Sequence, residues 1–274
     1  MTANVLVLAG YGLNCEEETL FAFQHAGLSG KVMHINALIE NPKALDEAQI
    51  LAVPGGFSYG DDTGSGNAFA QKMKLALWEP LKKFVSRDTL TIGICNGCQI
   101  LSNLGLVPGF DGAYGERLVA VTHNLSARYQ CRWIDVKAEG ASPWLVGAGQ
   151  MHIPVAHGEG RFMMSDDTLA TLKKNGQIAA RFVKADGSAA GGEFPHNPNG
   201  SLEDIAAITD QSGRVLAIMP HPERGMFTWQ RDDYAEAKDA AQRKGESLPD
   251  EADGMGLFRN AARYFETAKA RKSA

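Results

Sequence analysis

The sequence of 274 residues has no excess of positive charge. It contains 27 lysine and arginine residues against 32 aspartate and glutamate residues, which gives a formal net charge of −5. Proteins that bind nucleic acid or anionic lipid present clustered basic side chains, and this chain has no such cluster. We therefore expect neither nucleic acid nor a membrane surface among its partners.

Long hydrophobic runs are also missing. No apolar stretch reaches the length of about 20 residues that a membrane-spanning helix needs. The N-terminus, Met1-Thr2-Ala3-Asn4, leads directly into an expected strand, without the charged and apolar regions of a signal peptide. These absences favour a cytoplasmic protein, in which cysteines stay reduced.

Cysteine is scarce, and its spacing argues against a metal site. Of four cysteines, Cys15 and Cys131 are isolated, while Cys95 and Cys98 form one C-x-x-C pair. A zinc site needs two more ligands at a comparable spacing, and the sequence has no His-x-His and no second C-x-x-C. A thioredoxin-like redox pair is less favoured, because three expected strands precede Cys95. We expect no metal.

Nucleotide-binding motifs are missing as well. The chain matches neither the dinucleotide fingerprint nor the P-loop, so we expect no cofactor on it.

What is present is an alternation of strands and helices in the first hundred residues. Apolar runs predict strands at 4–9, 31–36, 50–53 and 90–94, and helical spacing predicts helices at 16–26 and 67–85. Strand, helix, strand at this rhythm is typical of an α/β protein with an open, mostly parallel sheet and helices on both faces.

The pattern changes beyond Gly109. Further strands are predicted, with few helices between them, at 128–137, 150–156, 178–183, 205–209 and 215–219. They either extend the first sheet as added antiparallel strands or build a smaller second sheet. Two helices, at 232–244 and 257–270, end the chain. We interpret residues 1–274 as a single domain, with a catalytic core at about 4–224 and a C-terminal helical extension at about 226–270.

Cys95 carries the first functional hypothesis. It lies in Gly93-Ile94-Cys95-Asn96-Gly97, where an apolar strand meets a stretch with helical spacing. This is the cysteine form of the nucleophile elbow, a strained turn that small neighbours permit. The free N–H groups of the following helix favour thiolate over thiol. A buried cysteine that acts as a small hydrophobe is the alternative, and the two flanking glycines make it less favoured.

A thiol nucleophile needs a base and a group that orients the base. His221 ends an apolar strand between Pro220 and Pro222, and Glu223 follows two residues later. The prolines restrict the backbone, so the imidazole is expected at the carboxyl edge of the sheet, where open α/β sheets bind ligands. Cys95, His221 and Glu223 are therefore the predicted catalytic residues.

A glycine-rich loop follows the third predicted strand. Its paired glycines, in Gly55-Gly56-Phe57, can present backbone N–H groups to an oxyanion beside the thiolate. The N–H of Asn96 is the second expected donor. A glycine-rich turn without chemistry is the alternative that this loop alone leaves open.

Together these segments resemble the class I glutamine amidotransferases, whose fold is flavodoxin-like. Other segments resemble, within that family, the glutaminase components of phosphoribosylformylglycinamidine synthase, which act in purine biosynthesis. The segments are Gly12–Glu16, Pro54–Asp61, Ile153–Gly160, Asn197–Ser201 and Met219–Arg224.

The resemblance implies that Cys95 attacks the side-chain amide of L-glutamine, releasing ammonia and leaving a thioester that water hydrolyses. His221 would act as base and then acid, and Glu223 would orient it. Gln99 and the segment His157, Gly158 and Glu159 match positions at which the family holds glutamine.

The resemblance also implies partners. Ammonia would pass to a synthetase component of phosphoribosylformylglycinamidine synthase, which would bind ATP and Mg²⁺ and convert formylglycinamide ribonucleotide to formylglycinamidine ribonucleotide. A small accessory subunit is a further expected partner.

Two segments depart from the family pattern, 62–67 and the long 226–256. The alternatives are another cysteine-elbow hydrolase or deglycase, in which histidine commonly follows the nucleophile, and a non-catalytic regulatory subunit.

Overall fold

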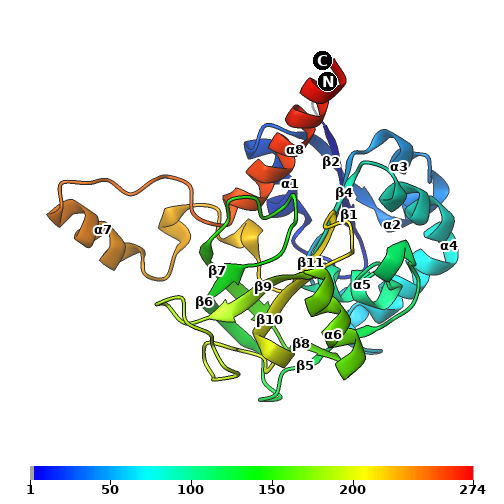
Figure 1. Ribbon diagram of the computed structural model, residues 1–274. Coiled ribbons are helices and arrows are strands. Elements are labelled where there is room, and N and C mark those ends of the chain that lie inside the picture. The colour runs from blue at the N-terminus through cyan, green and yellow to red at the C-terminus, as the bar shows by residue number, and fades with distance from the viewer. Residues whose placement is uncertain (1–2, 274) are drawn as a thin grey trace.

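The computed structural model describes residues 3–273, and the side chains of residues 3–267. Met1, Thr2 and Ala274 therefore lie outside the described residues, including the start of the N-terminus considered above. A nine-stranded sheet forms the centre of the molecule (Figure 1). In spatial order its strands are β2 (Ser29–His34), β1 (Asn4–Ala9), β3 (Ile50–Val53), β4 (Leu90–Ile94), β11 (Val215–Ile218), β10 (Ile205–Thr209), β9 (Ile178–Val183), β6 (Gln130–Ala138) and β7 (Gln150–His157).

The direction of the strands changes across this sheet. From β2 to β11 every neighbouring pair is parallel, and from β11 to β7 every pair is antiparallel. β5 (Val119–His123) and β8 (Glu159–Met164) form a separate antiparallel pair. The fold class is confirmed. All five strands predicted beyond Gly109 extend the first sheet, and the small second sheet is built by two strands that were not predicted, β5 and β8.

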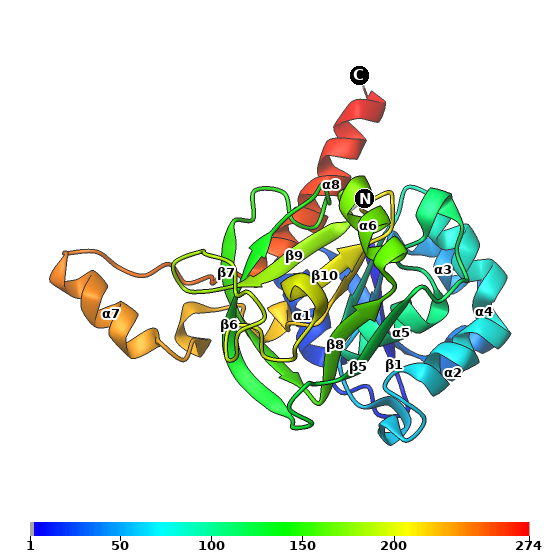
Figure 2. The same cartoon turned by 60° about the horizontal axis from the view of Figure 1, so that its bottom comes forward.

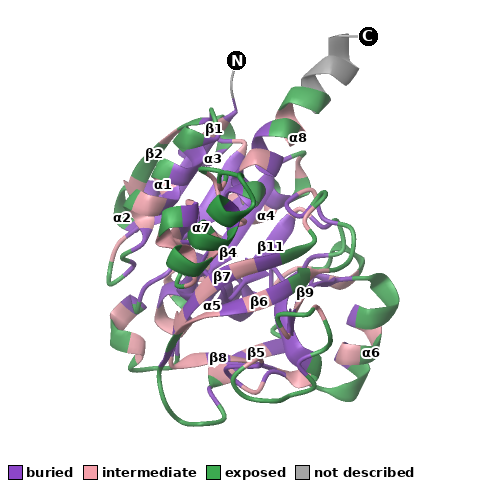
Figure 3. Ribbon diagram, turned by 90° about the vertical axis from the view of Figure 1, so that its left-hand side faces the viewer, coloured by how far each residue is buried: buried purple, intermediate pink, exposed green. Residues whose placement is uncertain are grey.

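Helices cover both faces of the parallel strands (Figure 1). α1 (Glu16–His25) packs with α8 (Met255–Ser273) on one face, and α4 (Asn67–Ser86) packs with α5 (Asn96–Leu104) on the other. Figure 3 shows the strands between these layers in the colour of buried residues. Every residue of β3, β4, β10 and β11 is buried, as the near-continuous apolar sequences of strands covered on both faces require.

Several elements differ from the sequence-based expectations. The strand predicted at 31–36 lies at Ser29–His34. It ends at His34 because this residue caps the next helix, α2 (Ile35–Glu40): the His34 Nδ1 atom accepts a hydrogen bond from the Asn36 amide. A short helix, α3 (Ala44–Glu47), follows it, and neither had been predicted. Beyond Gly109 the sequence analysis missed β5, β8 and α6 (Asp166–Asn175).

The segment between η4 (Pro222–Arg224) and α8 projects from the body as an arm (Figures 1 and 2). It contains α7 (Tyr234–Arg243), in which Ala241 alone is buried. At its root the two ring nitrogens of His152 on β7 pair with Asp135 on β6, at 3.3 Å, and with Asp232 on the arm, at 2.9 Å.

Within residues 3–273, none of the helices has both the length and the apolar character to cross a membrane.

Candidate active site

Cys95 occupies the turn between β4 and α5. Its backbone has φ +51° and ψ −104°, a left-handed conformation that is strained for a residue with a side chain. The flanking glycines are required by close backbone contacts. A Cβ atom at Gly97 would lie 1.8 Å from the Val53 carbonyl oxygen, and one at Gly93 would lie 2.5 Å from the Gly97 carbonyl oxygen. The geometry is that of the predicted elbow.

His221 reaches the same edge of the sheet from the neighbouring strand. β11 pairs with β4 in parallel, with Ile218 opposite Ile94, and the Cys95 amide donates to the Ile218 carbonyl oxygen over 2.8 Å. The His221 amide in turn donates to the Pro154 carbonyl oxygen on β7, also over 2.8 Å. Adjacent parallel strands thus bring together two residues that are far apart in the sequence.

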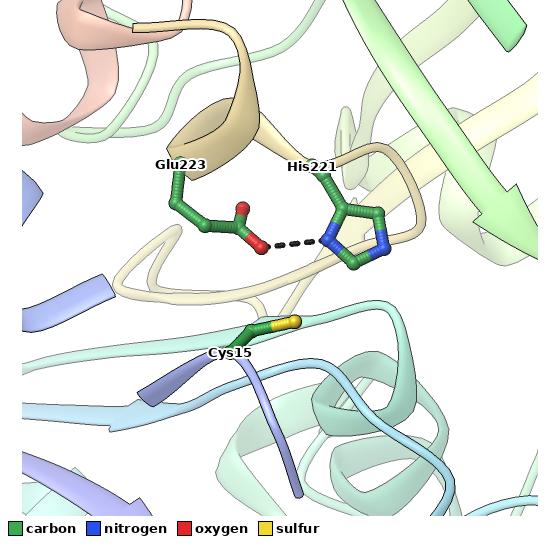
Figure 4. A group of neighbouring side chains, drawn as sticks. All are labelled: Cys15, His221 and Glu223. Atoms are coloured by element: carbon green, nitrogen blue, oxygen red, sulfur yellow. Dashed lines mark hydrogen bonds and ion pairs between the residues drawn. The ribbon is translucent and has the colours of Figure 1, made fainter. Parts of the chain in front are cut away.

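Glu223 orients the imidazole of His221. The His221 Nδ1 atom lies 2.6 Å from the Glu223 Oε1 atom, and both side chains are buried (Figure 4). Burial opposes the charged imidazolium, but the Glu223 carboxylate, supported by Cys95, raises the pKa of His221 above its ordinary value. The other ring nitrogen, Nε2, is buried and has no hydrogen-bond partner among the described residues. No other group among the described residues competes for the proton or the lone pair of this nitrogen.

Cys15 also lies at the site, although the sequence had indicated only that it belongs to the segment Gly12–Glu16. Cys15 is 1% exposed, and its sulfur lies below the contact between His221 and Glu223 (Figure 4). The Arg224 Nη2 atom donates to this sulfur over 3.0 Å. Burial raises the pKa of the Cys15 thiol, against a hydrogen bond with His221 that lowers it. Cys15 therefore sits beside the base as a protonated thiol.

The predicted oxyanion loop is paired with the loop between β1 and α1. The Asn14 amide donates to the Gly55 carbonyl oxygen over 3.0 Å, and the Phe57 amide donates to the Gly12 carbonyl oxygen over 2.8 Å. The Phe57 N–H is thus already used within the protein. The Gly55, Gly56 and Asn96 amides remain the predicted oxyanion donors, and the ring of Phe57 is exposed and can contact the substrate.

Asn96 and Gln99 join α5 to two loops around Cys95. The Asn96 Nδ2 atom donates to the Gln99 Oε1 atom over 2.8 Å, and the Gln99 Nε2 atom donates to the Glu159 carbonyl oxygen over 2.5 Å. The Ser58 amide donates to the Asn96 Oδ1 atom over 3.2 Å. Both ends of the Gln99 amide are engaged within the protein, so its contact with substrate stays a prediction.

His157 is buried beside the site and held by Asn124, which the sequence analysis missed. The His157 Nδ1 atom lies 3.2 Å from the Asn124 Oδ1 atom. Burial, together with the charge of His221, lowers the pKa of His157 to about 3, so its ring is neutral near pH 7. A Cβ atom at Gly160 would lie 2.4 Å from the His157 ring, so glycine is needed there for the ring to pack.

Glu159 connects the site to the unusual segment 62–67. The Ser65 amide donates to the Glu159 Oε2 atom over 3.2 Å, and the His123 Nδ1 atom lies 3.5 Å from Oε1. Asp61 is near enough for the charge of Glu159 to act on it, and burial is the main cause that raises the pKa of Asp61. These contacts place two carboxyl groups at one side of the site.

A cavity of about 440 Å³ opens between the oxyanion loop and the segment around Gly158. Three of the predicted residues, Phe57, Gly158 and Glu159, line it. The cavity also contacts residues that the sequence analysis did not single out, and these are Asp61, His123, Ala127, Arg128 and Tyr129. It therefore carries charged groups of both signs.

Two groups of side chains have the donor atoms to hold a metal ion. In each group the donor atoms lie within 4.8 Å of one another. One group is Cys15, His221 and Glu223, and the other is His152, Asp232 and Asp233. In the second group Asp233 is already paired with Arg231 at 2.7 Å, and His152 has the two carboxylate partners described above. That group is an ion-pair network.

Comparisons with known proteins identify the family of the chain. The family model of the CobB/CobQ-like glutamine amidotransferase domain matches residues 2–265. The phosphoribosylformylglycinamidine synthase subunit PurQ of Methanococcus maripaludis is 45% identical over 265 residues, which cover 95% of this chain and 97% of that protein. The subunit of the same name from Dehalococcoides mccartyi is 37% identical, with 94% and 96% covered.

A solved structure is similar over nearly the whole chain. A chain in the structure of PurLQS from Thermotoga maritima superposes with a TM-score of 0.68 at 27% identity, covering 97% of this chain and 100% of that one. The family model and the relatives extend across both the parallel strands and the antiparallel half of the sheet. On these grounds the chain belongs to the CobB/CobQ-like glutamine amidotransferase family.

Proposed function

We propose that this chain hydrolyses L-glutamine at Cys95 and supplies the ammonia for the conversion of formylglycinamide ribonucleotide to formylglycinamidine ribonucleotide. The observation that carries the proposal is the arrangement of Cys95 and His221. A cysteine on a strained elbow lies on the strand next to a buried histidine, which has Nδ1 held by Glu223 at 2.6 Å and Nε2 free.

The first half of the reaction releases ammonia. His221 Nε2 takes the proton of the Cys95 thiol as the sulfur attacks the amide carbon of glutamine, and the negative charge moves to the amide oxygen. The Gly56 and Asn96 amides donate to that oxygen. His221 then gives its proton to the leaving nitrogen, and the carbon–nitrogen bond breaks. Ammonia and a glutamyl thioester on Cys95 result.

The second half regenerates the enzyme. His221 removes a proton from water as the water oxygen attacks the thioester carbon, and the proton returns to the sulfur as the carbon–sulfur bond breaks. Glutamate is released. The carboxylate of Glu223 keeps the proton of the neutral ring on Nδ1, so that Nε2 is available as the base in both halves.

The cavity between the oxyanion loop and Gly158 has the groups that the backbone end of glutamine needs. Glu159 and Asp61 offer carboxylates for the α-ammonium group, and Arg128 offers a guanidinium for the α-carboxylate. The neutral His157 and the Gly158 backbone would position the side-chain amide. In this assignment Gln99 acts by holding the Glu159 backbone, to which it donates.

The ammonia acceptor is a separate synthetase component. The relatives are named as subunits of phosphoribosylformylglycinamidine synthase, and the similar solved structure is of PurLQS. We place ATP and Mg²⁺ on the synthetase, include a small accessory subunit in the assembly, and assign the complex to the cytoplasm. Because unused ammonia wastes glutamine, we expect weak glutaminase activity alone and strong stimulation by the loaded synthetase.

The test is glutamine hydrolysis by the isolated chain and by its complex with the synthetase. Cys95→Ala should abolish glutamine-dependent synthesis, while ammonium salt should restore it, because only the ammonia source is lost. If ammonium fails to rescue an intact complex whose synthetase is active with the wild-type chain, the proposed division of labour is wrong.

A further inference from the structure

The base and its orienting carboxylate have a third neighbour with metal-binding chemistry. The donor atoms of Cys15, His221 and Glu223 lie within 4.8 Å of one another, and all three side chains are buried. We propose that these three residues form an inhibitory site for a thiophilic divalent cation such as Zn²⁺. Binding of the metal does not depend on the proposed function, whereas the inhibition that follows rests on it.

The three donors are those that zinc prefers. Thiolate sulfur, imidazole nitrogen and carboxylate oxygen are all common zinc ligands, and three protein ligands with one open position are typical of accessible zinc sites. With zinc bonds of about 2.0 Å to nitrogen and oxygen, these two atoms would lie about 3.3 Å apart. The distance between Nδ1 and Oε1, which is 2.6 Å in the metal-free chain, would therefore increase by about 0.7 Å.

The Glu223 carboxylate also has an unused oxygen. Its Oε2 atom is buried and has no hydrogen-bond partner among the described residues. A metal ion can take this oxygen without displacing a partner from it, and the contact it replaces is the one between Nδ1 and Oε1. Glycine at position 55 keeps a side chain away from both donors, because a Cβ atom there would lie 2.7 Å from the His221 Cε1 atom and 3.0 Å from the Cys15 sulfur.

Although the metal-free thiol is protonated and donates to Asn14 Oδ1 over 3.3 Å, one neighbour would support a metal-bound thiolate. The Arg224 Nη2 atom donates to the Cys15 sulfur over 3.0 Å, and Arg224 is itself paired with Glu18 at 3.1 Å. Hydrogen bonds of this kind to a ligating atom commonly support metal sites. One thiolate and one carboxylate balance the charge of a divalent ion. The Arg224 side chain is 40% exposed, so its displacement gives the ion a route to the buried donors.

A metal ion at this position would disable the base. The ion replaces the proton of the Cys15 thiol, which is released, and binds the lone pair of His221 Nδ1. The ring proton, which now points at Glu223, must then move to Nε2. A ring that carries its proton on Nε2 cannot accept the proton of Cys95. Inhibition would therefore occur without any bond between the metal and the nucleophile.

Measurement of metal binding to cysteine variants distinguishes this site from a site formed by Cys95 and His221. The metal-free chain is titrated with Zn²⁺ against a chromophoric chelator, and with Co²⁺ while the near-ultraviolet band from sulfur to cobalt is recorded. We expect one ion per chain and a cobalt–sulfur band in both the wild-type and the Cys95→Ala protein. Cys15→Ser should lose the band and weaken binding by about 100-fold or more.

Matched cysteine controls complete the experiment. Cys131→Ser removes an exposed thiol and Cys98→Ser a buried one, and both should bind as the wild type does. Glu223→Gln gives a second variant if Cys15→Ser does not fold, and it should weaken binding while keeping the cobalt–sulfur band. Loss of binding in Cys95→Ala with retention in Cys15→Ser would place the metal on the nucleophile and overturn the proposal, as would the lack of stoichiometric binding by the wild type.

Zinc inhibition of glutamine hydrolysis is then measured in the same proteins. Zinc should inhibit the wild type, Cys98→Ser and Cys131→Ser alike, and Cys15→Ser should be resistant relative to its own metal-free rate. A chain that binds zinc through Cys15 but hydrolyses no glutamine would contradict the proposed function and leave the metal site standing.

Discussion

The Phe57 amide donates a hydrogen bond to the Gly12 carbonyl oxygen over 2.8 Å, and this bond fixes the glycine-rich loop after β3 against the loop that follows β1. Gly12 has φ +100°, and a Cβ atom there would lie 2.5 Å from the Phe57 carbonyl oxygen. The position of the predicted oxyanion donor Gly56 therefore depends on a glycine that contacts no reacting atom.

Gly12→Ala should reduce glutaminase kcat by about 100-fold, because a displacement of the oxyanion loop by about 1 Å misplaces the donor. Steady-state kinetics in the synthetase complex measure this. Gly27→Ala is the matched control, since Gly27 also has positive φ, at +90°, but has no atom within 4 Å of an added Cβ. Equal losses in the two variants would mean that backbone strain, and not loop contact, is responsible.

Only one cysteine of the C-x-x-C pair should act as nucleophile. Cys95→Ala or Cys95→Ser should lower glutamine hydrolysis by a factor of about 10⁶, the scale found when a nucleophile is removed. Cys98→Ser should keep most activity, because Cys98 is fully buried in α5 and burial raises the pKa of its thiol well above the ordinary value. Mass spectrometry after reaction with a glutamine-analogue electrophile checks the assignment. Modification of Cys98 would show that it is wrong.

Glu223→Gln should lower kcat by about 10⁴-fold while the fold is retained, because the amide no longer fixes the tautomer of the base. His221→Ala should lose at least as much. Circular dichroism of each variant controls for folding. Near-normal rates in His221→Ala would point to a different base, and His157 would be the first to examine.

The attachment of the arm should depend on pH. The hydrogen bond with Asp135 is the main cause that raises the pKa of His152 to about 8, from 6.5. A raised pKa stabilises the folded form fully below pH 6.5 and ceases to do so as the pH rises through about 8. The effect is on the order of 1 kcal/mol after solvent screening. Limited proteolysis of 226–254 should therefore become faster from pH 6 to pH 9.

The matching variant is His152→Gln, which has no charge to lose. Its arm should be cleaved quickly at every pH, so the ratio of wild-type to variant rates removes the pH dependence of the protease itself. A constant ratio across this range would show that His152 does not hold the arm.

The bounds of fully buried strands could be predicted from the sequence, and the bounds of some half-exposed elements could not. β3 and β4 are uninterrupted apolar runs, and their bounds were predicted correctly. β2 lies at the sheet edge with a mostly exposed, irregular pattern, so hydrophobicity did not locate its end at His34. α6 did have a signal: Ser165 caps it by accepting from the Thr168 amide, and Gly176 ends it in a left-handed conformation.

The positions of Cys95 and His221 at one edge of the sheet could be predicted because local sequence constrains both, through glycines around Cys95 and prolines around His221. Cys15 and Asn124 could not, since their contacts with His221 and His157 come from tertiary packing alone. Sequence spacing likewise argued against a metal site. Cys15 and His221 lie at opposite ends of the chain, and only the fold brings them together.

The pairing of Ile94 with Ile218 places nucleophile and base one strand spacing apart, about 4.8 Å between backbones. Their separation is therefore set by sheet hydrogen bonds, including the one from the Cys95 amide to Ile218. The chain between residues 105 and 214 can change in length without altering it. A slip of β11 by a single residue, in contrast, would turn His221 to the opposite face of the sheet. We therefore expect insertions in the loops of that connection to leave the spacing of Cys95 and His221 unchanged, and a shift in strand register to change it.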